Sequence, residues 1–171
     1  KNSSRHDFRL KFDVPAKVKR AVLYVTGEDT TAAWIGGVQV LKPQTQPAWG
    51  RTPWKSYTRV GGIPELHSGT NLLAIEVTRF SAGDHGQAPM SAELYIEMAD
   101  GSSKVLHTGA PEWKTQFNAP GDWHDESYDD AGWSQAVAYA PEKDAFGGQD
   151  KLGDPLPTAA VAACSCASAA R

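Results

Sequence analysis

The stretch "FRLKFDV", residues 8–14, alternates apolar and polar side chains with a period of two. Successive side chains of a β-strand point to opposite faces of a sheet, so this pattern predicts a half-buried strand. The segments "RAVLYVTG" (20–27) and "NLLAIEVTRF" (71–80) are also rich in residues that strands favour. No window shows a long apolar period of 3.6 residues, so we expect an all-β protein.

Turn residues separate the predicted strands. "TAAWIGGVQVL" (31–41) predicts a hairpin turning at Gly36-Gly37, and "SAELYIEMADGSSKVLHTG" (91–109) predicts a second one turning at Asp100-Gly101. "EWKTQF" (112–117) predicts a further short strand. Short strands at intervals of about ten residues with turns between them are typical of an antiparallel β-sandwich or jelly roll.

The overall composition is that of a soluble globular domain. The chain has 171 residues, of which 40% are hydrophobic and 22% are charged, which suits one domain with a sizeable core. A net charge of −3 gives no reason to expect nucleic acid or an anionic membrane as a partner. No apolar segment is long enough to cross a bilayer. We therefore expect neither a nucleic-acid nor a membrane partner.

The two ends of the sequence suggest a part of something larger. We place a β-sandwich domain at residues 1–141 and a surface-running tail and linker, rich in Gly, Pro and Ala, at 142–171. The sequence begins at Lys1 without a methionine, so we expect a processed or excised fragment. Cys164 and Cys166 are too close for an unstrained disulfide and too few for a structural zinc site.

An acidic cluster near the end of the predicted domain has two interpretations. "DESYDDAGW" (125–133) places four carboxylates in six positions. They could form a catalytic or metal site. They could also belong to a structural closing segment, in which Tyr128 and Trp133 fill apolar gaps while Asp129 and Asp130 cap backbone N–H groups. We favour the structural interpretation.

Five segments in order resemble a known family. They are "FRLKFDVPAKVKRAVLYVTGED" (8–29), "AAWIGGVQV" (32–40), "WKSYTRVGGIPELHSGTNLLAIEV" (54–77), "AELYIEMADGSSKVLHTGAPEWKT" (92–115) and "WHDESYDDAGWSQAV" (123–137). Together they resemble the galactose-binding-like jelly-roll domains of bacterial glycoside hydrolases, closest to the N-terminal and carbohydrate-binding domains of α-L-rhamnosidases. The resemblance spans about residues 8–141. It implies that Trp123–Trp133 folds back across the sandwich as a closing segment.

The resemblance implies a non-catalytic role, and the residues agree. Glycoside hydrolysis needs two carboxylates at a defined separation, and nothing marks out such a pair among the 20 acidic residues. The five histidines show no metal-ligand spacing, and no nucleophile elbow or phosphate-binding glycine loop is present. We therefore expect a carbohydrate-binding or accessory domain of a larger secreted, extracellular or periplasmic enzyme. The alternatives are a purely structural accessory domain and a free-standing hydrolase or lyase.

Jelly-roll modules bind glycans on loops at one end, using aromatic platforms and polar side chains. The candidate loops are "GEDTT" (27–31), "KPQTQPAWGRTPW" (42–54) and "RFSAGDHGQAPMS" (79–91). Five residues in them are the predicted carbohydrate contacts: Asp29, Trp49, Arg51, Asp84 and His85. Each has a plain alternative, since Asp29 could cap a turn, Trp49 could fold inward, and Asp84 with His85 could form a solvated loop tip.

The other tryptophans are predicted to lie mostly in the core. We expect four tryptophans in the core, namely Trp54, Trp113, Trp123 and Trp133, while Trp34 should face away from its neighbours Ala33 and Ile35. The expected partners are the catalytic domain of the parent enzyme and a plant or algal glycan that could contain rhamnose. No cofactor is required by the sequence, although related sandwiches often hold a structural calcium ion through oxygen ligands.

Overall fold

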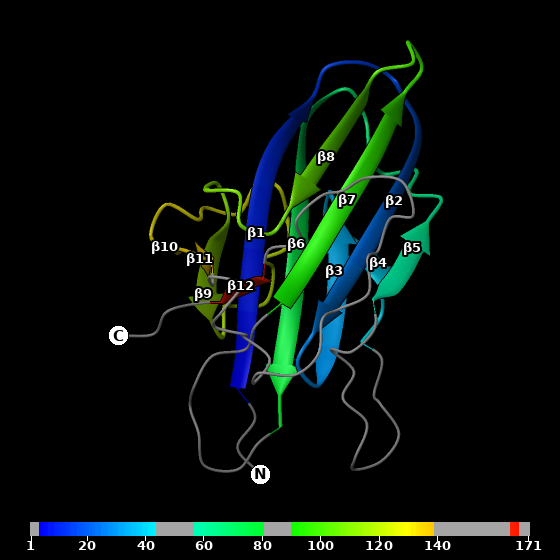
Figure 1. The fold of residues 1–171 in the computed structure, drawn as a ribbon. Coiled ribbons are helices and arrows are strands. Elements are labelled where there is room, and N and C mark those ends of the chain that lie inside the picture. Colours follow the sequence, from blue (N-terminus) through cyan, green and yellow to red (C-terminus); the bar gives the residue numbers. More distant parts are fainter. Residues whose placement is uncertain (1–3, 44–56, 81–89, 139–164, 168–171) are drawn as a thin grey trace.

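The computed structural model describes residues 4–43, 57–80, 90–138 and 165–167. Within these ranges the secondary structure consists of strands and turns without a helix. The strands form two antiparallel sheets that pack face to face (Figure 1). The predicted all-β sandwich is therefore confirmed. The described ranges also contain no helix long and apolar enough to cross a membrane.

The first sheet has six strands in the order β10-β9-β1-β6-β3-β4. Its strands are β1 (Ser4–Val14), β3 (Thr30–Ile35), β4 (Val38–Leu41), β6 (Gly69–Arg79), β9 (Lys114–Phe117) and β10 (Ser134–Gln135). β1 and β6 pair along their full length, from Ser4 opposite Arg79 to Val14 opposite Gly69. The stretch that predicted the fold thus lies inside the first sheet, between β9 and β6.

The second sheet has the order β11-β12-β7-β2-β5, and β8 also pairs with β7. Its strands are β2 (Val18–Gly27), β5 (Thr58–Gly61), β7 (Met90–Met98), β8 (Ser103–His107), β11 (Val137–Ala138) and β12 (Ser165–Ala167). β12 lies within the predicted tail, where the Cα of Cys166 is opposite Met90 and Ala138. Cys164 lies outside the described residues, and the domain boundary at 141 stays a prediction.

The main core lies between the two sheets. Apolar side chains from alternate positions of β1, including Phe8 and Leu10, meet Leu23 of β2 and Leu94 of β7, and all four are at most 2% exposed. Trp113 is also in this core and is 1% exposed, as the sequence predicted. The period-two pattern therefore identifies the inward face of β1 correctly.

The outward face of β1 differs from the expectation of a solvated polar face. Asp7 and Arg9 point outward yet are 0% and 1% exposed. They are covered by residues 119–133, a range that begins four residues before the predicted Trp123–Trp133 and that we call the closing segment from here on. This segment forms a second, smaller core with Leu72 and Ala74 on the outer face of β6. The first sheet is thus buried on both faces over part of its width.

Both predicted hairpin turns are present. Gly36 and Gly37 have φ values of 55° and 80°, and Gly101 has φ of 87°. These left-handed conformations favour glycine because it lacks a Cβ atom. The Gly36-Gly37 turn joins β3 to β4 at the edge of the first sheet.

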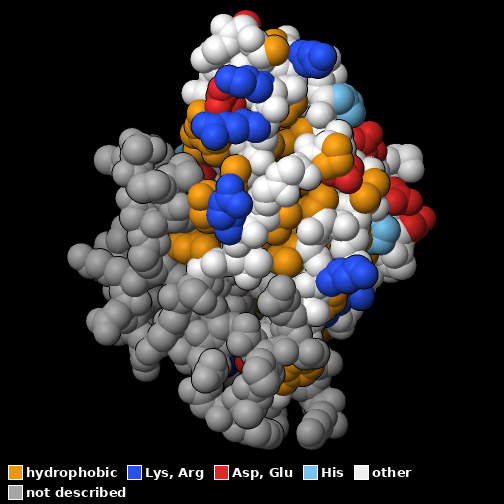
Figure 2. Space-filling model, turned by 90° about the vertical axis from the view of Figure 1, so that its right-hand side faces the viewer, with side chains coloured by type: hydrophobic (Ala, Val, Ile, Leu, Met, Phe, Trp, Pro, Cys, Tyr) orange, Lys and Arg blue, Asp and Glu red, His pale blue; other side chains and the backbone are white. Residues whose placement is uncertain are grey.

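One side of the sandwich carries the outermost strands β4 and β5 (Figure 1). Val40 and Val60 on these strands are partly buried and pack against the main core. Figure 2 shows this side, where hydrophobic side chains lie among charged side chains of both signs. Val38 at the start of β4 is 50% exposed.

Candidate functional site

Three connections open at the same end of the sandwich, the lower end in Figure 1. The strand registers place Thr30 opposite Thr78, Thr58 opposite Val25, and Met90 opposite Gly27. The β2–β3, β4–β5 and β6–β7 connections therefore leave from neighbouring strand ends. These are the three loops in which the sequence places its carbohydrate-contact residues.

Asp29 in the β2–β3 connection ties that turn to the end of β6. Its backbone N–H donates to the carbonyl oxygen of Thr78 at 3.2 Å. The backbone N–H of Phe80 donates to the Asp29 carboxylate at 2.5 Å. Asp29 therefore caps the turn, which was the structural alternative for this residue. It also lies at the end of the sandwich from which the three candidate loops depart.

The other four predicted contact residues lie outside the described part of the chain. Trp49 and Arg51 fall in residues 44–56, and Asp84 and His85 fall in residues 81–89. The described structure fixes only the strand ends from which their loops depart. Their role as ligand contacts stays a prediction.

Glu28 and Arg79 form a charged pair beside Asp29, and neither was among the predicted contact residues. The Arg79 Nε atom lies 3.8 Å from Glu28 Oε1, and about a quarter or less of each side chain is exposed. Burial raises the pKa of Glu28, while the positive charge of Arg79 acts in the opposite direction. The pair adds one cationic and one anionic group to the polar chemistry at this end.

Gly27 lets the turn approach β6 closely. A Cβ atom at this position would lie 2.5 Å from Thr31 Oγ1 and 2.9 Å from Val77 Cγ2. Contacts below 3.0 Å are repulsive, so a larger residue would push the turn away from the sheet. The glycine that ends β2 thus keeps Glu28 and Asp29 against the end of β6.

Exposed aromatic side chains also occur on the first sheet near this end. Phe80 directly follows β6 and is 56% exposed, and Phe117 at the end of β9 is 49% exposed. The Phe117 ring contacts His6 edge-on, with a centroid distance of 5.3 Å. Phe80 lies in the candidate loop 79–91, but neither phenylalanine was among the five predicted contacts.

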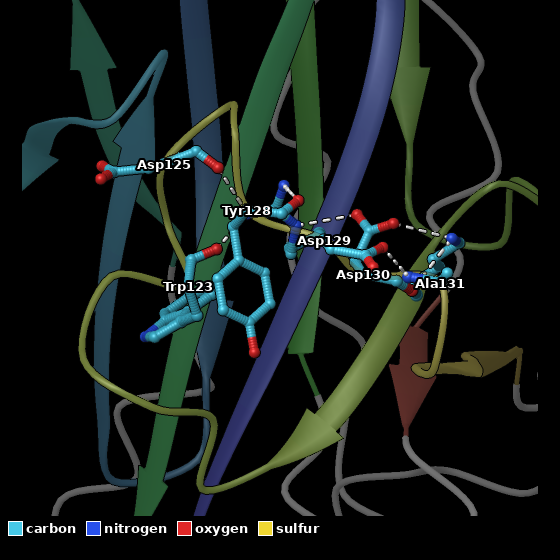
Figure 3. Close-up of polar contacts among 8 residues, drawn as sticks. Trp123, Asp125, Tyr128, Asp129, Asp130 and Ala131 are labelled. Carbon is cyan, nitrogen blue, oxygen red and sulfur yellow. Dashed lines mark hydrogen bonds and ion pairs between the residues drawn. The ribbon is translucent and has the colours of Figure 1, made fainter.

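The acidic cluster of the closing segment holds the fold together. The Asp130 carboxylate accepts from Arg9 Nε at 2.9 Å and from Lys114 Nζ at 2.8 Å. The Asp129 carboxylate accepts from the backbone N–H of Ala131 at 2.9 Å. Figure 3 shows Tyr128, Asp129 and Asp130 lying across β1. The structural interpretation of the cluster is confirmed, with one correction: the Asp130 carboxylate accepts from side chains of β1 and β9, where the sequence predicted a backbone N–H.

Arg9 is the central anchor of the closing segment. Besides Asp130, its guanidinium donates to the backbone carbonyls of Trp123, Asp125 and Tyr128. The guanidinium carbon also lies 5.4 Å from the centre of the Tyr128 ring, within the range of a cation–π interaction. Burial alone would raise the pKa of Asp130, but the hydrogen bonds from Lys114 and Arg9 outweigh it and hold that pKa below its usual value.

The tryptophans of this region agree with their predicted positions in two cases and differ in one. Trp123 is 2% exposed in the second core. Trp34 faces away from the main core and stacks on His124, with ring centroids 5.1 Å apart. Trp133 is only partly buried at the margin of the second core, because it packs on one side against Trp123 and Tyr128. Trp54 lies outside the described residues.

A second polar group lies where the closing segment begins. The Asp7 carboxylate accepts from the backbone N–H of Ala119 at 2.7 Å and from Arg5 Nε at 3.1 Å. Its neighbour across the strands is another acid, Glu76. Burial raises the pKa of Asp7 to about 7, although the bonds from Ala119 and Arg5 act to lower it.

Metal binding has no support from side-chain clusters within the described ranges. They contain no group of three or more His, Cys, Asp or Glu residues placed to hold a metal ion. A structural calcium ion, which the sequence leaves open, is not tested by this observation, since calcium also takes backbone carbonyl ligands.

Comparisons with known proteins place this chain beside parts of larger enzymes. It is 25% identical over 134 residues to an α-L-rhamnosidase of Streptomyces avermitilis, covering 78% of this chain and 12% of that enzyme. The crystal structure of the S. avermitilis α-L-rhamnosidase complexed with L-rhamnose matches with a TM-score of 0.66 and 25% identity, over 78% of this chain and 13% of the other. No family model matches the sequence.

A lectin has a similar fold. The Pleurotus ostreatus lectin in complex with GalNAc matches with a TM-score of 0.65 and 22% identity, over 80% of this chain and 38% of the lectin chain. The expected resemblance to regions of α-L-rhamnosidases is confirmed. This chain spans only a small fraction of the rhamnosidase length.

Proposed function

We propose that this chain is a non-catalytic carbohydrate-binding or accessory domain of a larger glycan-degrading enzyme. The observation that carries the proposal is the common end of the sandwich from which all three predicted ligand loops depart. Loops on a rigid β scaffold are frequent sites of ligand recognition. Similarity to a small region of an α-L-rhamnosidase supports a module that accompanies catalysis.

The ligand we propose is an oligosaccharide or polysaccharide of plant or algal origin that contains rhamnose. The similar S. avermitilis structure contains L-rhamnose. We also propose an extracellular or periplasmic location, where a secreted glycan-degrading enzyme would act. The catalytic domain of the parent enzyme is the proposed protein partner, and a structural calcium ion is a further proposed ligand.

Calorimetric titration of the 171-residue chain with a panel of oligosaccharides tests the proposal. The panel contains rhamnose-bearing and rhamnose-free glycans, and each titration is done with calcium and with a chelator. We expect saturable binding to at least one rhamnose-bearing glycan. If no glycan binds in either condition, the chain is a structural accessory domain, and release of reducing sugar during incubation would identify a hydrolase.

Trp49→Ala tests the predicted loop contacts. Its neighbours Pro47 and Pro53 restrict the chain on both sides, which lowers the entropy lost when a ring is ordered on binding. We expect at least about tenfold weaker glycan binding, on the scale of aromatic stacking on bases, and an almost unchanged melting temperature. Unchanged affinity would remove Trp49 from the site, and unfolding would place it in the core.

A further inference from the structure

Asp7 is a fully buried carboxyl group whose two oxygens have different surroundings. Its side chain is 0% exposed. The Oδ2 atom accepts from the backbone N–H of Ala119 at 2.7 Å and from Arg5 Nε at 3.1 Å. The Oδ1 atom is also buried but has no hydrogen-bond partner among the described residues. A proton on Oδ1 would turn this oxygen into a donor, which needs an acceptor close by.

A second carboxyl group lies directly opposite Asp7. Glu76 is its partner in the pairing of β1 with β6, and side chains at such positions have Cβ atoms about 4.5–5.5 Å apart. Glu76 is 21% exposed, and its carboxylate lies 3.8 Å from Arg5 Nε. The same guanidinium contacts Asp7. Two acids on neighbouring strands therefore share one cation.

The other charged groups around the pair do not add a second cation to it. The charged and titratable groups packed on this part of the sheet come from three elements, namely Arg5 and Arg9 of β1, Lys114 of β9, and His124 and Asp130 of the closing segment. Arg9 and Lys114 are both bound to the carboxylate of Asp130. β9 places the uncharged Gln116 opposite Asp7.

The electrostatic environment favours a proton within this pair. Burial raises the pKa of Asp7 to about 7, and the negative charge of Glu76 adds to the rise, while Ala119 and Arg5 act to lower it. Burial also raises the pKa of Glu76, against the charges of Arg5 and His124. When two carboxyl groups share a site, ionisation of one disfavours ionisation of the other. The titration steps then belong to the pair.

We propose that Asp7 and Glu76 share one proton, and that losing this proton releases the start of the closing segment from β1. With the proton on Oδ1, Asp7 donates to the Glu76 carboxylate and keeps Oδ2 for Ala119. Without it, two negative charges face each other with one guanidinium between them, which is unfavourable in a buried place. β1 and β6 are paired along their full length, so the cover over Asp7 is the part that moves.

Ala119 is the residue at which the release acts. Its backbone N–H donates to Asp7, and its carbonyl oxygen accepts from Arg5. It is 3% exposed and belongs to the second core together with Trp123. When Ala119 leaves the strand, water reaches the ionised Asp7. The start of the closing segment is thus a latch that is shut while the acid pair holds its proton and opens as the pH rises.

Two NMR measurements on the full 171-residue chain test the latch. Carboxyl carbon shifts give the titration midpoints of Asp7 and Glu76, and we expect both groups to respond over the same range near neutral pH. Hydrogen exchange gives the protection factor of the Ala119 amide. It should fall by up to about tenfold per pH unit between about pH 4 and pH 7, because opening releases one proton in that range. The amide of Leu23, which is 0% exposed in the main core, reports global unfolding and should stay better protected.

Glu76→Gln removes the second acid and keeps the size of the side chain. The Asp7 midpoint should fall by about one pH unit, and the decline in Ala119 protection should end at a correspondingly lower pH. Asp13→Asn is the matched control, because Asp13 also lies on β1 opposite a β6 residue, Thr70, and it should leave the Asp7 midpoint nearly in place.

The two parts of the proposal are overturned by different results. An Asp7 midpoint near its ordinary value of 3.8, or one that Glu76→Gln does not move, overturns the shared proton. Ala119 protection that does not depend on pH, or that equals the protection of Leu23 throughout, overturns the release. The measurements on the parent protein need no substitution, so they decide the second part even if Glu76→Gln does not fold.

Discussion

Arg9 is a charged side chain enclosed within the fold, and its surroundings show why an arginine is required. Its side chain is 0% exposed and forms an ion pair with Asp130 at 2.9 Å. The planar guanidinium presents several N–H donors in fixed directions, and here they reach three backbone carbonyls as well. One side chain of β1 thereby satisfies backbone groups along much of the closing segment.

Arg9→Ala should destabilise the protein strongly. The substitution leaves the Asp130 carboxylate and several carbonyls without their buried donor, and removing one partner of a buried ion pair costs about 3–5 kcal/mol. Chemical denaturation monitored by tryptophan fluorescence measures the loss. The matched control is Arg20→Ala, because Arg20 also pairs with a carboxylate, Glu97, but is 66% exposed. Equal stability losses in the two variants would contradict the anchoring role of Arg9.

Gly37 is required both by its own backbone and by the closing segment above it. Its φ is 80°, and a Cβ atom there would lie 3.0 Å from the Asp125 carboxylate. Gly37→Ala should cost about 1–2 kcal/mol from the left-handed conformation alone. Gly132→Ala is the control, because a Cβ at Gly132 meets nothing within 4 Å. Equal unfolding free energies for the two variants would show that the hairpin tip adapts without strain.

The closing segment is an element built without regular secondary structure along most of its length. Its turns are formed by backbone bonds such as Asp125 N–H to Asp122 and Tyr128 N–H to Asp125. Its stability comes from Trp123, which packs on Leu72 and Ala74 of β6, and from the polar anchors on β1. The segment gives the first sheet a second core on its outer face.

Trp123→Ala should therefore destabilise the protein more than Trp133→Ala. Trp123 is 2% exposed, and truncating a core aromatic residue costs about 3–5 kcal/mol. Trp133 lies at the margin of the same cluster and is only partly buried, so its removal leaves a smaller cavity. Urea unfolding at matched pH gives the two free energies. The reverse order would mean that the segment is held mainly through its C-terminal half.

The sequence predicts the strands well and the outer face of β1 poorly. Period-two alternation identifies Phe8, Leu10 and their neighbours as core because they face the opposite sheet. The same pattern marks Asp7 and Arg9 as solvent-facing, whereas residues more than 100 positions away bury them. Such a contact leaves no local signal in a strand. The acidic cluster could be assigned to structure, but its partner on β1 could not be identified.

The candidate binding end is predictable to the same limited degree. The turn composition locates Asp29 at the correct end, because glycine and acidic residues separate two clear strands. The positions of Glu28 and Phe80 at this end depend on the pairing of β3 with β6. This pairing brings the end of the β2–β3 connection, which contains Glu28, against the start of the β6–β7 connection, which contains Phe80. Pairing between distant strands is not encoded in either loop alone.

At the scale of the whole molecule, the candidate ligand loops and the closing segment occupy different regions. The loops leave one end of the sandwich (Figure 1), while the closing segment lies over the outer face of the first sheet. Substitutions in the closing segment should therefore change the unfolding free energy, and those in the loops should change ligand affinity. Asp7 is near both regions, because it holds Ala119 and its own strand begins at the loop end.

Asp7 and Asp130 are two buried acids that hold the closing segment. They should change the free energy of unfolding with pH in opposite directions. Burial raises the pKa of Asp7 to about 7 from an ordinary value of 3.8, so the folded protein holds a proton there that the unfolded chain has released. The stabilisation from Asp7 is complete below about pH 4 and is lost as the pH rises through about 7. The pKa of Asp130 lies below its usual value, so its contribution is present above the ordinary pKa and is lost as the pH falls through the folded-state value.

Asp7→Asn separates these contributions. Between about pH 4 and pH 7 the unfolding free energy of the parent protein should decrease with pH, with Asp7 contributing at most about 1.4 kcal/mol per pH unit. The introduced amide can still accept from the Ala119 N–H but cannot titrate, so the variant should show a shallower decrease. Asp13→Asn removes an exposed carboxylate from the same face of β1 and controls for the general effect of removing a negative charge there. Urea titrations at several pH values measure the free energy of unfolding and its slope with pH. An unchanged slope in Asp7→Asn would mean that the buried carboxyl does not take up a proton on folding.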